Sequence, residues 1–235
     1  MNTLGDQIKT LVQNLIYIEP CSFNRVKPGD LNLKGGQIFV TQFSHFTRNF
    51  PRWLAAVSAN CPLPDVRQFI AGNLSEEEGG APGHRSHYEL LVTQGEALGL
   101  SREEIEHTIP LPTTALAVNA LNGICRNREW LEALAATTGL ECINHPQVRS
   151  VAGALIINNV RAWEHLDLNA QQLESRTIHM ENDERHVEAG LAILAAHSTS
   201  KEANDRILCA AHEAVFAFRV LMDGIGRAAL TLHNV

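Results

Sequence analysis

The stretch TTALAVNALNGICRNREWLEALAATTGLE, residues 113–141, is rich in alanine and leucine and contains no proline. Alanine and leucine lose little side-chain freedom in a helix and are among the strongest helix formers. Gly123 and Gly139 are small enough to let a neighbouring helix pack closely. The stretch predicts an almost unbroken helical region. It therefore favours an α-helical fold, with which the rest of the chain agrees.

Helical spacing of apolar residues extends to both sides of this stretch. In the region before residue 113, Pro51 should kink a helix or start a new one, because proline disrupts a helix interior. No strand pair and no internal repeat is found, so the sequence predicts an all-α bundle of seven to eight helices forming one domain over residues 1–235. Outside 113–141, the expected helices cover residues 4–15, 37–59, 64–78, 86–100, 148–166, 179–197 and 198–230.

Composition and charge narrow the class of partner. The chain has 235 residues, of which 45% are hydrophobic, and 19 basic against 26 acidic residues give a formal net charge of -7. This balance indicates a small-molecule substrate, and it disfavours nucleic acid and an anionic membrane surface as partners. The longest apolar runs, such as VAGALII at 151–157, are too short to cross a bilayer, and the first residues lack the pattern of a signal peptide. We therefore expect a soluble, cytoplasmic protein.

The octet HMENDERH, residues 179–186, carries His179, Asp183 and His186 at steps of four and three. Each helical residue advances by about 100°, so these three side chains share one stripe of a helix. Such spacing also arises by chance on solvated helix faces, and the octet alone does not establish a metal site. Its meaning depends on whether further ligands come from elsewhere in the chain.

Two other segments can supply such ligands. The stretch NLSEEEGGAPGHRSHYELL, residues 73–91, places an acidic run ahead of His84 and His87. Glu141 ends an apolar helical run, where an unpaired carboxylate would be costly to bury. Carboxylates and imidazoles without a thiolate suit iron or manganese better than structural zinc. The residues alone leave open which glutamate and which histidine of 73–91 take part.

The order NLxEE…G…H, then a glutamate closing an Ala-rich helix, then HxxxDxxH, resembles the haem-oxygenase-like di-iron oxidases. The resemblance extends from about Phe50 to the last helix. It implies the all-helical haem-oxygenase-like fold, two Fe(II) ions without haem, and O2 as co-substrate. His84 and Glu132 stay open as alternatives to His87 and Glu141. The ligand set that the resemblance implies, which is also the catalytic set, is Glu77, His87, Glu141, His179, Asp183 and His186.

Members of this family oxidise amino acids, fatty acids and N-hydroxylated compounds. We favour a small carboxylate substrate, above all an amino acid and including a tryptophan derivative, with C–C cleavage or nitrile formation. The aromatic residues Phe43 and Phe46 could line its pocket, and Arg48 or Arg149 could bind its carboxylate at two points. The alternatives are a fatty-acid decarboxylase or desaturase of the same family, a metal-free thiaminase-like hydrolase, and a binding module.

A self-sacrificing aminobenzoate synthase, in which a tyrosine of the protein becomes the product, fits the sequence less well. Only Tyr17 and Tyr88 are present, and the segment QIFVTQFSHF (37–46) carries phenylalanines where tyrosines would be required. Val151 stands where that subfamily has a lysine. The resemblance leaves open a homodimer and an external electron donor.

Overall fold

The computed structural model describes residues 3–27, 29–80, 83–151 and 160–230, and for residues 161, 164 and 179–183 it describes the backbone alone. Within this part of the chain the regular structure is helical throughout, without a strand. The helices of ten or more residues are α1 (Leu4–Gln13), α2 (Leu33–Thr47), α3 (Phe50–Asn60), α4 (Pro64–Glu77), α5 (His87–Ala97), α7 (Pro112–Asn127), α8 (Trp130–Glu141), α11 (His179–His197) and α12 (Lys201–Leu230).

Short helical turns connect these helices. The remaining elements are α6 (Arg102–Glu106), α9 (Pro146–Arg149), α10 (Glu174–Thr177), a π-helical segment Asn14–Ile18, and 3-10 turns at Phe23–Arg25, Cys142–Asn144, Val160–Ala162 and Glu164–Leu166. The prediction of an all-α protein is confirmed. The prediction of seven to eight helices is too low, since nine helices of ten or more residues lie in the described part of the chain.

Two of the expected helices are each divided in two. Residues 37–59 form α2 and α3, because Pro51 occupies the first turn of α3, where its missing N–H removes no helical hydrogen bond. Residues 113–141 form α7 and α8, because Arg128 and Glu129 adopt extended backbone between them. Arg128 pairs there with Glu213 of α12.

The helix expected over residues 148–166 is not observed in the described residues. The α-helix there ends at Arg149, and the segment returns as 3-10 turns from Val160. Residues 152–159 lie outside the described part of the chain. Trp163 packs edge-on against Phe39, with ring centroids 5.2 Å apart, so a tertiary contact accompanies the irregular backbone.

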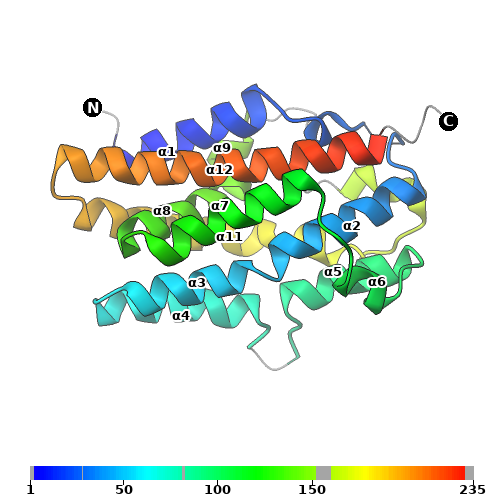
Figure 1. Ribbon diagram of the computed structural model, residues 1–235, viewed down its shortest axis with the longest axis horizontal. Coiled ribbons are helices and arrows are strands. Elements are labelled where there is room, and N and C mark those ends of the chain that lie inside the picture. Colours follow the sequence, from blue (N-terminus) through cyan, green and yellow to red (C-terminus); the bar gives the residue numbers. More distant parts are fainter. Residues whose placement is uncertain (1–2, 28, 81–82, 152–159, 231–235) are drawn as a thin grey trace.

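The longest helix, α12, runs along almost the whole molecule and contacts α8, α7, α2 and α1 (Figure 1). α8 lies between α12 and α11, while α3 packs on α4 and α2 packs on α5. The apolar faces of these helices meet in one continuous core that includes Trp53, Phe39 and Leu121. α4, α5, α8 and α11 therefore approach one another from segments far apart in the sequence.

Small residues allow the close helix contacts around α8. A Cβ on Gly139 would lie 3.4 Å from Val215 Cγ2 of α12, and one on Gly190 of α11 would lie 2.5 Å from Thr138 Oγ1 of α8. Gly139 thus lies on the packed face of α8, as the sequence predicts, although a Cβ there would make only ordinary van der Waals contacts. The same prediction is wrong for Gly123, around which a Cβ would meet nothing within 4 Å.

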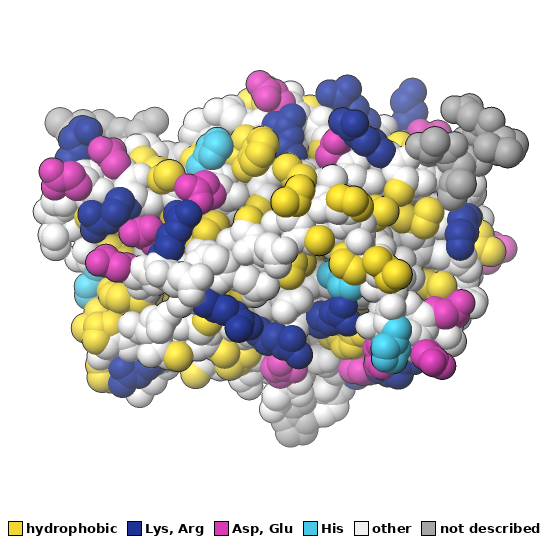
Figure 2. All heavy atoms as spheres, viewed as in Figure 1, with side chains coloured by type: hydrophobic (Ala, Val, Ile, Leu, Met, Phe, Trp, Pro, Cys, Tyr) yellow, Lys and Arg dark blue, Asp and Glu magenta, His cyan; other side chains and the backbone are white. Residues whose placement is uncertain are grey.

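Basic and acidic side chains are intermixed on the face of the molecule shown in Figure 2, with apolar side chains between them. This face carries no large area of a single charge. Of the helices in the described ranges, none has the length and apolar character needed to span a membrane.

Candidate functional site

Four buried side chains from four helices converge at one end of an internal pocket. Glu77 is the last residue of α4, His87 the first residue of α5, and Glu141 the last residue of α8. His186 comes from the second turn of α11. Two carboxylates and two imidazoles are therefore brought together across a span of more than a hundred residues in sequence.

The turn between α4 and α5 places Glu77 beside His87. Gly79 has φ of 70°, a conformation that favours glycine, and a Cβ at this position would lie 2.6 Å from the backbone of Arg85. Ser86 caps α5 by accepting a hydrogen bond from Glu89 N–H. As a result, His87 Nδ1 lies 2.8 Å from Glu77 Oε2.

His87 is buried against Glu77, whereas His84, the alternative in the sequence, is exposed to solvent. The two candidate glutamates of α8 differ in their partners. Glu141 is buried, whereas Glu132 pairs with Arg206 of α12 at 3.3 Å. The structure thus pairs Glu77 with His87 and places Glu77 and Glu141 in the lining of one pocket, and it leaves both alternatives outside these contacts.

Glu141 and His186 meet where α8 and α11 pack closely. Glu141 Oε1 lies 3.7 Å from His186 Nδ1, and it also accepts a hydrogen bond of 3.4 Å from Asn73 Nδ2. Asn73 is buried on α4, one turn before Glu77. Asn73 was not predicted from the sequence, although its position four residues before a candidate ligand was a usable signal, because residues i and i+4 share a helix face.

Glu76 lies on the outer side of the cluster. One of its oxygens accepts a hydrogen bond of 2.5 Å from Arg185, and the other lies 3.1 Å from His186 Nε2. Burial opposes ionisation of Glu76, but the hydrogen bond and charge of Arg185 and the charge of His186 outweigh it and lower the pKa of this carboxyl. His186 therefore has a carboxylate near each ring nitrogen.

The remaining two predicted ligands, His179 and Asp183, lie outside the described side chains. Their backbone belongs to α11, which begins at His179. The HxxxDxxH segment therefore has the helical backbone that its spacing requires.

Among the side chains that the structure describes, no three histidine, cysteine, aspartate or glutamate residues form a ready-made metal cage. The chemistry of the four that converge nevertheless fits iron, which accepts carboxylate oxygen and imidazole nitrogen. Buried carboxylates beside buried imidazoles are typical of metal sites in helical bundles, where ligands project inward from several helices. Glu77, His87, Glu141 and His186 are thus the described residues that could hold a metal.

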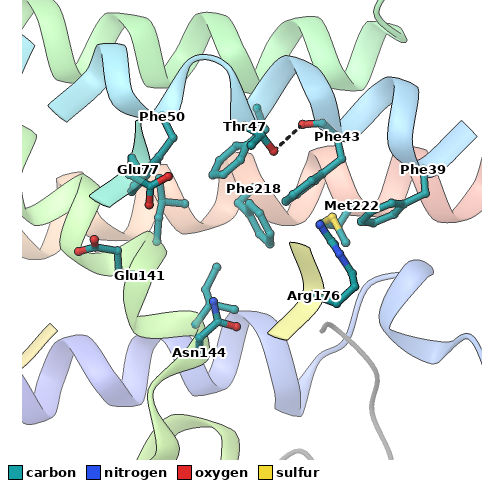
Figure 3. Close-up of a pocket in the computed structure, with 13 residues that line it drawn as sticks. Phe39, Phe43, Thr47, Phe50, Glu77, Glu141, Asn144, Arg176, Phe218 and Met222 are labelled. Carbon is teal, nitrogen blue, oxygen red and sulfur yellow. Dashed lines mark hydrogen bonds between the residues drawn. The ribbon is translucent and has the colours of Figure 1, made fainter. Parts of the chain in front are cut away.

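Five phenylalanine rings are among the thirteen residues that line the pocket next to this cluster, which we call the phenylalanine-lined pocket (Figure 3). Its empty space amounts to about 670 Å³, mouth included. Phe43 and Phe46 line it, as the sequence analysis expects. The full lining consists of Phe39, Phe43, Phe46, Thr47, Phe50, Glu77, Leu140, Glu141, Ile143, Asn144, Arg176, Phe218 and Met222.

The two arginines expected to bind a substrate carboxylate do not line this pocket. Arg48 donates to the backbone carbonyl of Glu106 and contacts His45 at 2.5 Å, and Arg149 ends the short helix α9. Arg176 of α10 lines the pocket in their place. Arg176 was not predicted from the sequence because residues 170–178 have no clear helical period, and its position three residues before His179 was the available signal.

Comparison with known proteins shows which family and which enzymes this chain is similar to. A family model described as "Iron-containing redox enzyme" matches residues 37–219. The chain is 24% identical over 237 residues to a 4-aminobenzoate synthase of Chlamydia muridarum, and this alignment covers 99% of this chain and 94% of that enzyme. It is 30% identical over 176 residues to a pyrroloquinoline-quinone synthase of Pseudomonas aeruginosa, and this alignment covers 73% of this chain and 66% of that enzyme.

Solved structures agree on the fold. A domain of unknown function with a haem-oxygenase-like fold from Shewanella denitrificans superposes with a TM-score of 0.76 at 17% identity, covering 97% of this chain and 92% of that chain. The prediction of a haem-oxygenase-like fold is confirmed by this likeness.

Proposed function

Because the chain belongs to the family of iron-containing redox enzymes, we propose that it is a non-haem di-iron oxidase that uses O2 to oxidise a small carboxylate substrate. An amino acid is the substrate we favour, and a tryptophan derivative would suit the aromatic pocket. Iron bound at the cluster would supply the redox chemistry with O2, which no protein side chain provides by itself. The residues that would hold it are Glu77, His87, Glu141 and His186, together with His179 and Asp183.

One observation carries this proposal: the buried carboxylate and imidazole cluster opens directly into the phenylalanine-lined pocket. Glu77 and Glu141 belong to both, since they lie in the cluster and also line the pocket. A substrate in the pocket would therefore lie against the same carboxylates that hold the metal. The rings of Phe43, Phe46 and Phe50 would keep water away from it.

A cysteine-dependent hydrolase is supported less well. None of the five cysteines lines the pocket. Burial raises the pKa of Cys125 and of Cys142 to about 12, so neither thiol is activated at neutral pH. Exposed Cys209 donates to Glu213, and this hydrogen bond raises the pKa of its thiol.

A protein tyrosine as the substrate is also supported less well, although a 4-aminobenzoate synthase is among the relatives. The hydroxyl of Tyr17 donates to the backbone carbonyl of Ile143 at 2.7 Å, and neither Tyr17 nor Tyr88 lines the pocket. An external substrate therefore fits the pocket better than a side chain of the protein.

The test is to purify the protein anaerobically, add ferrous iron and count the ions bound per chain, then follow O2 consumption with a panel of amino acids and fatty acids. We expect two ions per chain and O2 uptake that depends on one class of carboxylate. His87→Ala and Glu141→Ala should each lower the number of ions bound.

The chain offers matched controls for both variants. His84→Ala and Glu132→Ala remove the same side-chain types from neighbouring positions outside the cluster, and they should keep full iron binding. If the wild-type protein takes up no iron, the di-iron proposal is wrong.

A further inference from the structure

A buried arginine without a carboxylate partner lies at one end of the phenylalanine-lined pocket. Arg176 is 2% exposed, and burial alone lowers its pKa to about 9, so its guanidinium is still a cation at neutral pH. Among the described residues no carboxylate forms an ion pair with it. An unpaired buried charge destabilises a fold, and an anionic ligand would remove this cost.

Neutral groups hold one edge of the guanidinium in place. Arg176 Nε donates to Ser175 Oγ at 3.2 Å, and Ser175 Oγ in turn donates to Gln94 Oε1 of α5 at 2.7 Å. All three side chains are buried. Because these partners carry no charge, they orient the guanidinium without neutralising it.

Aromatic rings flank the guanidinium of Arg176 and restrict where a partner can bind. Its Cζ lies 4.8 Å from the ring centroid of Phe39 and 5.2 Å from that of Phe43. With Nε already engaged by Ser175, the two terminal nitrogens are left for a ligand. Two parallel N–H donors match the two oxygens of a carboxylate.

We propose that Arg176 binds the carboxylate of the substrate at two points and that the apolar body of the substrate extends along the phenylalanine rings towards Glu77 and Glu141. Figure 3 shows Arg176 at one end of the pocket and the two glutamates at the other, with Phe43 and Phe218 between them. The ligand class is therefore a small carboxylic acid with an aromatic or branched apolar body.

This orientation of the substrate makes the proposed function more specific, and it rests on that function for the kind of reaction that is catalysed. The end of the substrate that is remote from its carboxylate faces the metal-binding cluster. A fatty acid that loses its carboxylate would have to lie the other way round, with the carboxylate at the cluster. The position of Arg176 thus argues against fatty-acid decarboxylation and, by the same geometry, against C–C cleavage or nitrile formation next to the carboxylate of an amino acid.

The test compares an acid with its neutral analogue in protein that holds no iron. Binding of 3-phenylpropionate and of 3-phenylpropionamide is measured by titration calorimetry on the metal-free protein, and again after loading with redox-inert Zn2+. We expect the acid to bind at least about tenfold more tightly than the amide, as a charge-assisted contact requires.

Three variants locate the source of this preference. Arg176→Met fills similar space without charge and should abolish the preference, and Arg176→Lys keeps the charge without the planar fork and should reduce it. Arg149→Met removes an arginine that does not line the pocket and should leave the preference unchanged. Far-ultraviolet circular dichroism checks that each variant keeps its helical fold.

The proposal is overturned if the wild-type protein binds neither probe, if it binds both equally in the two metal states, or if Arg176→Met keeps the preference for the acid. Counting ferrous ions on the same preparations separates this outcome from failure of the proposed function. A carboxylate preference without iron uptake would leave Arg176 as an anion anchor in a protein that is not a di-iron oxidase.

Discussion

Gly190 of α11 and Thr138 of α8 are so close that a methyl group on Gly190 would lie 2.5 Å from Thr138 Oγ1. His186 lies one turn before Gly190, and Glu141 lies about one turn after Thr138. The close contact of the two helices therefore sets the separation of His186 from Glu141, which is 3.7 Å between Nδ1 and Oε1. Close packing of Gly190 against Thr138 thus sets the α8–α11 side of the candidate metal site.

Gly190→Ala should force α8 and α11 apart. Rotation of the Thr138 side chain moves Oγ1 and Cγ2 but leaves its Cβ in place, 3.3 Å from the new methyl group, so a tight contact remains in every rotamer. Overpacking costs about 1–3 kcal/mol, of which the better helix propensity of alanine returns up to about 1 kcal/mol. We expect a lower free energy of unfolding in urea and weaker iron binding.

The controls for Gly190→Ala lie in the same chain. Adding Thr138→Ala removes both clashing atoms and should restore stability. Gly123→Ala, at a helix position where a Cβ meets nothing within 4 Å, should be neutral or slightly stabilising. A Gly190→Ala protein as stable as the wild type would show that the helices separate without cost.

Asn73→Ala should weaken metal binding without removing a ligand. Asn73 Nδ2 donates to Glu141 Oε1 at 3.4 Å and so links α4 to α8. Partners that orient metal ligands typically change metal affinity by about 10- to 100-fold. Competition with a chelator should show that loss of affinity at unchanged stoichiometry, whereas Asn60→Ala, at an exposed position of α3, should show none.

The pH dependence of stability should contain a contribution from His45. Burial, together with the positive charge of Arg48, lowers the pKa of His45 to about 4 from an ordinary value of 6.5. Between these values the unfolded chain binds a proton that the folded protein does not, so stability falls as the pH falls from about 6.5 towards 4. Above pH 7 this contribution no longer changes.

His45→Gln removes this titration, and its melting temperature should therefore depend less on pH between 7.5 and 5 than that of the wild type. His107→Gln, a change at an exposed histidine, should keep the wild-type slope. Parallel curves for the wild type and His45→Gln would mean that His45 titrates normally in the folded protein.

Local pattern was sufficient to predict most of the helices. The spacing of apolar residues predicted α11 and its end at His197, and Pro51 marked the boundary at which α3 begins. The break between α7 and α8 was not predicted from helix propensity, and it coincides with a pairing between Arg128 and a distant residue of α12. Tertiary contacts override local preference at such places.

The candidate site likewise contains residues that were predicted from the sequence and residues whose role appears only in the tertiary structure. The resemblance to the haem-oxygenase-like di-iron oxidases implied Glu77, His87, Glu141 and His186, and the fold pairs Glu77 with His87 and Glu141 with His186. Arg176 was missed because its distinguishing feature is burial without an opposite charge, and this depends on the whole fold. Arg48 was a reasonable candidate from sequence, but its side chain binds the backbone of Glu106 outside the pocket.

The adjacent glutamates at the end of α4 should respond differently to removal of their charge. Glu77 is buried, contacts His87 and lines the pocket, whereas Glu76 binds Arg185 and lies at the outer nitrogen of His186. If Glu77 is a ligand, Glu77→Gln should lower the number of ferrous ions bound per chain. Glu76→Gln should keep that number and weaken the affinity, because it only loosens the orientation of His186.

Measuring both variants by anaerobic iron titration separates stoichiometry from affinity. Each substitution removes one negative charge from the same end of the same helix, so a general electrostatic effect on iron would lower binding equally in the two proteins. Loss of an ion in Glu76→Gln but not in Glu77→Gln would instead exchange the roles assigned to the two residues. The side of α4 that faces the pocket is then not the side that binds metal, and the link drawn between the phenylalanine-lined pocket and the metal cluster would have to be abandoned.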